Sequence, residues 1–167
     1  SSDLSRLQCF ESYKKILGKK SIPYGGFANE TKPGLFDKIA RFVRGNFFIP
    51  DARVGWNRFA IAKASELIRN EGIDVVITSS PPHSTQLIGL ELKKHFPIKW
   101  IADLCDPWTD IYYYNEFYHL PFALKKDQDY ERRVIEESDR ILIASPPWKA
   151  LFQSKTKKPT EAKTFFL

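Results

Sequence analysis

Apolar residues recur along most of the chain in two spacings, one typical of helices and one typical of buried strands. Apolar positions three or four residues apart predict helices over about residues 35–43, 56–68, 83–96, 121–137 and 149–153. Short apolar runs predict strands near Val75, Trp100, Ile141 and Phe165. Strands that alternate with helices favour a parallel sheet. We therefore expect an α/β fold, a three-layer Rossmann-like sandwich with a mostly parallel sheet and helices on both faces.

The pattern divides the chain at about residue 33. Residues 1–33 hold a weak helical stripe of Leu7, Phe10, Tyr13 and Leu17, followed by glycine and proline, which predicts a short helix and a loop. Residues 34–167 are numerous enough to form one domain with its own core. Because the chain begins without Met, we also expect it to be an excerpt or a processed form of a longer protein.

The chain is basic, with a net charge of +6 and an isoelectric point near 9.3. No nucleic-acid-binding motif accompanies this charge, so we expect no nucleic-acid partner. Four lysines at positions 14, 15, 19 and 20 fit a solvated basic face, with contact to anionic lipid headgroups as the alternative. The sequence has no apolar run near the ~20 residues of a membrane span and no signal peptide, which favours a cytoplasmic protein.

A polar loop, S-S-P-P-H-S, follows the first predicted strand, at the end of the sheet where α/β folds bind ligands. It contains Ser80, Pro82, His83 and Ser84, at the start of a predicted helix whose unpaired N–H groups favour an anion such as phosphate. A serine that only caps the helix is an equal alternative. His83 fits either contact with a substrate or a structural role. The prolines here, and in A-S-P-P-W after the third strand, suit the first helical turn.

A second loop, D-L-C-D-P-W, follows the next strand and contains Asp103 and Asp106. These carboxylates could orient substrate hydroxyls or assist proton transfer, and loop architecture is the alternative. Cys105 stands between them, which disfavours its thiolate and makes it a poor nucleophile.

Other enzyme classes are not favoured by the motifs. A hydrolase built on Ser80, His83 and Asp106 lacks a nucleophile elbow, because Pro81 and Pro82 stand where small residues are needed. The phosphate-loop, dinucleotide-binding and zinc-protease motifs are all missing, which disfavours a nucleotide-hydrolysing or zinc enzyme.

Four motifs in order resemble the N-terminal domain of bacterial family 4 glycosyltransferases, over about residues 35–167. They are R-G-N-F-F-I-P-D-A-R-x-x-W (44–56), D-V-V-I-T-S-S-P-P-H-S (74–84), K-W-I-A-D-L-C-D-P-W-T-D (99–110) and Y-E-R-R-V-I-E-E-S-D-R-I-L-I-A-S (130–145). The resemblance implies one half of a GT-B enzyme, in which an acceptor-binding domain faces a domain that holds a nucleotide-sugar. It further implies retaining sugar transfer in cell-surface polysaccharide synthesis, with no metal and no cofactor, because the nucleotide-sugar is a substrate.

The resemblance also implies site residues and partners. The implied catalytic residues are Asp106 and His83. The implied substrate-binding residues are Ser80, Pro82, Ser84, Trp108, Asp103 and Arg53. The implied partners are a nucleotide-sugar and a saccharide or lipid-linked acceptor, with peripheral contact to the inner membrane face left open. Arg53 would contact phosphate groups of a lipid-linked acceptor. A salt bridge from Arg53 to Asp51 or Glu66 is the alternative. A non-catalytic module that binds a phosphorylated ligand is the alternative function.

Two departures from the family pattern limit what the chain is expected to do. Cys105 stands where the family usually has Arg, which puts the type of acceptor in question. The first strands of the domain and the donor domain are expected to lie outside this chain, which predicts an inactive fragment. The strand at Val75 would then be an unpaired edge, and such edges invite pairing with a second copy or with residues 1–46.

Overall fold

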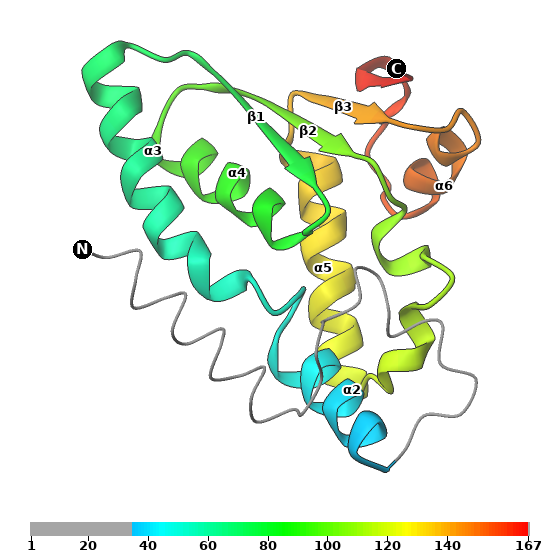
Figure 1. Ribbon diagram of the computed structural model, residues 1–167. Helices are drawn as coiled ribbons and strands as arrows, with labels where there is room; N and C mark the ends of the chain where they lie inside the picture. The colour runs from blue at the N-terminus through cyan, green and yellow to red at the C-terminus, as the bar shows by residue number, and fades with distance from the viewer. Residues whose placement is uncertain (1–34, 167) are drawn as a thin grey trace. The chain divides into compact units, whose positions relative to one another are not determined.

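A computed structural model describes residues 35–166, which belong to one compact unit that begins at Leu35 (Figure 1). The helix and loop predicted for residues 1–33, Cys9 and the four lysines between positions 14 and 20 lie outside the described residues.

Two helices precede the sheet. α2 spans Leu35–Phe47, and α3 (Asn57–Glu71) follows the short 3-10 helix η1 (Val54–Trp56). Gly72 ends α3 with a φ of 65°, the left-handed stop that glycine favours. Gly45 lies inside α2, although a glycine near the end of a predicted helix is often its left-handed stop. A Cβ at Gly45 would lie 2.6 Å from the carbonyl oxygen of Phe117, so this glycine allows a close approach and the helix continues.

The next three elements form the predicted strand–helix–strand unit. β1 (Val75–Ser80) and β2 (Lys99–Leu104) are parallel neighbours, and α4 (Ser84–His95) connects them. The peptide bonds before Pro81 and Pro82 are cis, and both prolines precede the helix. The prediction that proline occupies the first turn of this helix is therefore wrong, because α4 begins only at Ser84.

The rest of the chain completes a four-stranded parallel sheet. The elements after β2 are η2 (Trp108–Asp110), η3 (Tyr114–Phe117), α5 (Pro121–Glu137), β3 (Arg140–Ile143), α6 (Trp148–Ser154), η4 (Glu161–Lys163) and β4 (Thr164–Phe166). The strand order β1-β2-β3-β4 follows the chain, and all neighbours are parallel. The predicted α/β class, a Rossmann-like sheet flanked by helices, is thereby confirmed.

The helices α4, α5 and α6 lie on the same face of the sheet, because right-handed crossovers between strands in chain order all pass one side. The main core forms between this face and the helices. It consists of Leu90, Trp100, Ala102, Leu104, Trp108, Val134, Ile135, Ile141, Ile143 and Phe152. A smaller core between α3 and α4 includes Ile68, Ile88, Leu92 and Ile98.

The opposite face of the sheet is open within the described residues. Val75, Ile77 and Phe165 are 46%, 62% and 46% exposed. The unbroken apolar run of β1 predicts burial on both faces, but residues 35–166 cover only one, and they do not supply the second helical layer. β1 is also an edge strand in this part of the chain.

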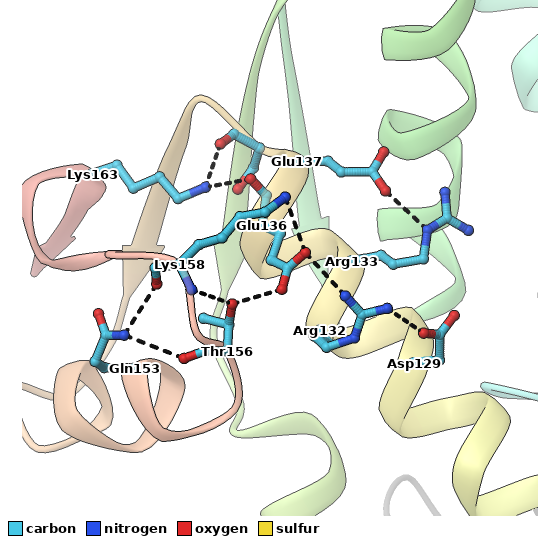
Figure 2. A network of polar contacts seen from close by, with 10 residues as sticks. Asp129, Arg132, Arg133, Glu136, Glu137, Gln153, Thr156, Lys158 and Lys163 are labelled. Atoms are coloured by element: carbon cyan, nitrogen blue, oxygen red, sulfur yellow. Dashed lines mark hydrogen bonds and ion pairs between the residues drawn. The ribbon is translucent and has the colours of Figure 1, made fainter.

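A polar network fastens the carboxyl end of α5 to the segment that leads into β4 (Figure 2). The Glu136 carboxylate accepts hydrogen bonds from Arg132 at 3.0 Å and from the Thr156 hydroxyl at 2.7 Å. Lys163 donates to the carbonyl oxygens of Glu136 and Ser138 at 2.9 and 2.7 Å. These bonds hold the connection that places β4 beside β3.

Candidate functional site

The sequence-predicted loops meet at the carboxyl end of the sheet. Ser80 at the end of β1 pairs with Leu104 at the end of β2, and Leu104 pairs with Ile143 at the end of β3. The loop at 81–83 and the loop at 105–107 therefore emerge side by side, as the parallel arrangement predicts.

The amino end of α4, predicted to bind an anion or to be capped by serine, is occupied by the Asp51 carboxylate. The Ser84 backbone N–H donates to Asp51 Oδ2 at 2.7 Å, and the Ser84 hydroxyl donates to Oδ1 at 2.9 Å. The next two amides donate to the carbonyl oxygens of Pro82 and His83. A negative charge already sits on the positive end of the helix dipole, so the first turn offers no cradle for a phosphate.

Ser80 belongs to the joint between sheet and helix. It is 1% exposed, and its hydroxyl donates to the Asp103 carbonyl oxygen at 3.2 Å. The fully buried Gln86 amide donates to Ser80 Oγ at 3.1 Å and to the same Asp103 oxygen at 2.8 Å. With these partners, Ser80 is not hydrogen-bonded to His83, and the triad of a serine hydrolase is not assembled.

The Asp103 carboxylate lies on the open side of the sheet. It accepts a hydrogen bond from the Ser79 hydroxyl at 2.6 Å, and the Cys105 sulfur lies 3.6 Å from both of its oxygens. Partial burial and the neighbouring carboxylates of Asp103 and Asp106 raise the pKa of the exposed Cys105 thiol. This thiol stays protonated at neutral pH, in line with the prediction that it is a poor nucleophile.

Asp106, the predicted catalytic carboxylate, has no partner among the described residues. Its half-buried side chain makes no hydrogen bond or ion pair with the described residues. Burial raises the pKa of the Tyr113 hydroxyl, and the Asp106 charge nearby raises it further, so this phenol is a neutral neighbour. Asp106 thus keeps its acceptor capacity for a ligand.

The Arg53 side chain also has no hydrogen bond or ion pair with residues 35–166. Its guanidinium is exposed, and it is the backbone N–H of Arg53, 2.8 Å from Asp51 Oδ1, that contacts the carboxylate. Glu66 pairs with Lys63 at 2.7 Å. Neither of the salt bridges considered for the Arg53 side chain forms.

His83 and Trp108 form a stacked pair between the two loops. Their ring centroids are 4.7 Å apart with an interplanar angle of 12°. Burial is the main cause that lowers the pKa of His83 to about 4; the Asp51 charge opposes the shift and Lys155 adds to it, so the imidazole is neutral at pH 7. Its buried Nδ1 has no hydrogen-bond partner within residues 35–166. Trp108 is only 1% exposed and is covered by His83, so it supports the histidine and does not offer an open platform to a sugar ring.

A buried acidic pair on α5 lies beneath this stack. Asp127 accepts hydrogen bonds from Trp108 Nε1 at 3.0 Å and from the Tyr114 hydroxyl at 2.7 Å. Burial raises the pKa of Asp127 to about 6. Glu131 pairs with Lys155 at 2.7 Å, and its second oxygen, Oε1, is buried without a partner among the described residues. The hydrogen bond to Asp127 helps to hold Trp108 in its left-handed conformation, at a φ of 35°.

The sequence interpretation missed Asp127 and Glu131, although a signal was present. Both occupy positions in α5 that continue the buried stripe of Val134 and Ile135 at helical spacing. A charged residue that helical spacing places on the buried face of a helix is expected to be hydrogen-bonded. Such residues often hold the side chains of a functional site in position.

Within the described residues, no group of three or more His, Cys, Asp and Glu side chains is arranged to hold a metal ion. In the same part of the chain, every helix is too short or too polar to cross a bilayer.

A scan against protein-family models, a search of curated proteins and a search of solved structures each found no match to this chain. The resemblance to family 4 glycosyltransferases therefore remains a prediction from the four sequence motifs.

Proposed function

We propose that the chain is the acceptor-side domain of a retaining glycosyltransferase that moves a sugar from a nucleotide-sugar to a saccharide or lipid-linked acceptor. The observation that supports this most is the Asp106 carboxylate, which has no partner within the described residues and stands at the carboxyl end of the parallel sheet. A polar group left half-buried and unpaired is commonly a ligand contact, because it costs free energy in the empty protein.

In this proposal, Asp106 accepts a hydrogen bond from the acceptor hydroxyl that attacks the donor sugar. That contact orients the hydroxyl and raises its electron density, which is the role of a general base or a positioning carboxylate. His83, on the neighbouring loop, stays neutral, so it would contribute a hydrogen bond to the acceptor without adding charge. Asp103 and Ser79 form the exposed rim, where a second hydroxyl of the acceptor would bind.

The exposed Arg53 guanidinium is the candidate phosphate contact. A guanidinium binds phosphate oxygens through two parallel hydrogen bonds, and here neither Asp51 nor Glu66 competes for it. Ser80, Pro82 and Ser84 position the loop from inside, because the first helical turn and Gln86 use their polar atoms. We place the reaction in the cytoplasm.

The alternative of a non-catalytic module that binds a phosphorylated ligand has less support. It requires an anion site at the amino end of α4, and Asp51 fills that position.

The test is sugar transfer by the native gene product that carries this chain, assayed with a panel of labelled nucleotide-sugars and acceptors. Asp106→Asn is expected to lower kcat by about 100-fold or more, as is usual when a general base is lost. Asp74→Asn is the matched control, since Asp74 is an exposed carboxylate at the opposite end of the sheet. Full activity of the folded Asp106→Asn protein would overturn the site. A wild type that transfers no sugar would overturn the proposed function.

A further inference from the structure

Helix α2 has its apolar side outward. Its exposed side chains include Leu35 (74%), Phe36 (87%), Ile39 (52%) and Phe47 (70%). The residues that it buries are Arg41, Gly45 and Asn46. A surface helix of a soluble domain normally buries its apolar stripe, so this orientation is the reverse of the usual one.

Specific polar bonds fix the reversed orientation. Arg41, 4% exposed, pairs with Glu116 at 2.7 Å. The Asn46 amide donates to the carbonyl oxygen of Tyr118 at 3.1 Å, and its own oxygen accepts the Leu120 backbone N–H at 2.6 Å. Gly45 packs directly against Phe117. These contacts are between parts of the chain more than 70 residues apart, so the polar side of α2 is built to face the domain.

Within residues 35–167, the net positive charge lies in the same region as the outward apolar side. Residues 35–59 hold five Lys and Arg against two Asp, a net charge of +3. Residues 60–167 hold fifteen Lys and Arg and fifteen Asp and Glu, so their net charge is zero. Lys38, Arg53 and Arg58 are exposed in this region, among exposed aromatic side chains that include Phe48 and Trp56.

We propose that α2 docks on an anionic lipid bilayer, lying in the interface with its phenylalanines in the acyl boundary. Exposed aromatic residues flanked by Lys and Arg are the composition of helices that lie in a membrane surface. Anionic headgroups attract the basic residues beside them. A shallow apolar hollow of about 320 Å³, lined by Lys38, Ile39, Phe42 and Tyr118, adds an insertion point next to the helix.

Charge favours an anionic bilayer over the two other partners that could cover α2, which are residues 1–34 and a second copy of the chain. Residues 1–34 contain six Lys and Arg against three Asp and Glu, so they also carry +3 and would be repelled. A second copy would bring the same basic surface against itself. The complementary partner is negative and apolar, which describes an anionic membrane. This inference does not depend on the proposed sugar transfer.

The test is co-sedimentation of the full chain with vesicles of phosphatidylcholine alone, or of phosphatidylcholine mixed with phosphatidylglycerol. We expect binding to the anionic vesicles and little to the neutral ones. The variant Phe36→Ser/Phe47→Ser is expected to bind at least about tenfold more weakly, because two aromatic side chains no longer insert. Lys38→Glu/Arg58→Glu is expected to lose the preference for anionic lipid.

The matched control is Phe166→Ser, a phenylalanine with 59% exposure on β4, which should bind like the wild type. Failure of the wild type to bind anionic vesicles, or equal loss in the Phe166→Ser control, would overturn the proposal. So would light scattering that shows a dimer in solution which Phe36→Ser/Phe47→Ser dissociates, because the apolar side would then be an interface between two copies.

Discussion

Helices α2 and α4 are of nearly equal length, 13 and 12 residues, but α4 turns its apolar side toward the domain and α2 turns its apolar side outward. α4 buries Ile88, Leu90 and Leu92 and exposes basic residues in its last turn. α2 buries Arg41 and Asn46 and exposes its phenylalanines. Hydrophobic spacing identifies both as helices, but which side faces the domain depends on what the polar residues find there. α4 is held by the core, and α2 is held by hydrogen bonds.

The largest expected difference between the two regions is the cost of removing an aromatic ring. Trp100 is fully buried against Gly89 of α4, and its indole N–H donates to Thr78 at 2.8 Å. Trp100→Ala should lower the free energy of unfolding by about 3–5 kcal/mol, while Phe36→Ala on α2 should change it by less than about 0.5 kcal/mol. Urea unfolding measures both. Similar losses in the two variants would mean that the apolar side of α2 is buried.

The next effect tests the attachment of α2. Gly45→Ala places a methyl group against the backbone of Phe117, which cannot move aside without shifting the connection around it. We expect a loss of about 1–3 kcal/mol and faster amide hydrogen exchange throughout α2. Gly55→Ala is the control, because nothing lies within 4 Å of a Cβ at Gly55. Unchanged exchange in the Gly45→Ala protein would contradict the described contact.

A smaller effect is expected at the amino end of α4. Asp51→Ala removes the carboxylate that caps the Ser84 backbone N–H and hydroxyl, and should cost about 0.5–2 kcal/mol in the free energy of unfolding. It also vacates the anion position, so inorganic phosphate should stabilise this variant more than the wild type, as thermal unfolding would show. Equal stability of Asp51→Ala and wild type would show that another group caps the helix.

The smallest net effect concerns pH, because His83 and Asp127 act in opposite directions. Burial lowers the pKa of His83 from 6.5 to about 4, so its contribution to stability is present above pH 6.5 and is lost as pH falls toward 4. Burial raises the pKa of Asp127 from 3.8 to about 6, so its contribution is present below pH 3.8 and is lost as pH rises through 6.

We therefore expect the two slopes largely to offset each other between pH 4 and 6. In Asp127→Asn only the histidine slope remains, and the free energy of unfolding should fall more steeply with decreasing pH than in the wild type. Urea titrations at several pH values provide the comparison. Parallel profiles for the two proteins would show that Asp127 does not titrate in this range.

Local spacing predicted most of the fold. The four strands and the α5 helix each follow from residues close together in the sequence. The cap of α4 was not predicted, because Asp51 lies 33 residues before Ser84. The reversed orientation of α2 was not predicted either, since the residue that pairs with Arg41 lies 75 positions later.

The candidate site was predicted in part. The prediction that the two loops lie side by side is confirmed, because the carboxyl ends of parallel strands share one edge of the sheet. The sequence could not show that Ser80 and Ser84 bond to other parts of the domain while Asp106 has no partner in the described part of the chain, since both outcomes are compatible with the same residue types. Asp127 could have been found from its place in the buried stripe of α5.

Side-chain footprinting with a photoactivated carbene, with and without anionic vesicles, tests the reversed α2 helix most directly. In buffer, we expect Phe36 and Phe47 to be labelled strongly and Leu90 and Leu92 of α4 to be protected, in accord with their exposure. With vesicles, labelling of Phe36 and Phe47 should fall while that of Phe166 stays the same. Protection of Phe36 and Phe47 already in buffer would contradict the outward apolar side, and labelling unaffected by vesicles would contradict its docking on lipid.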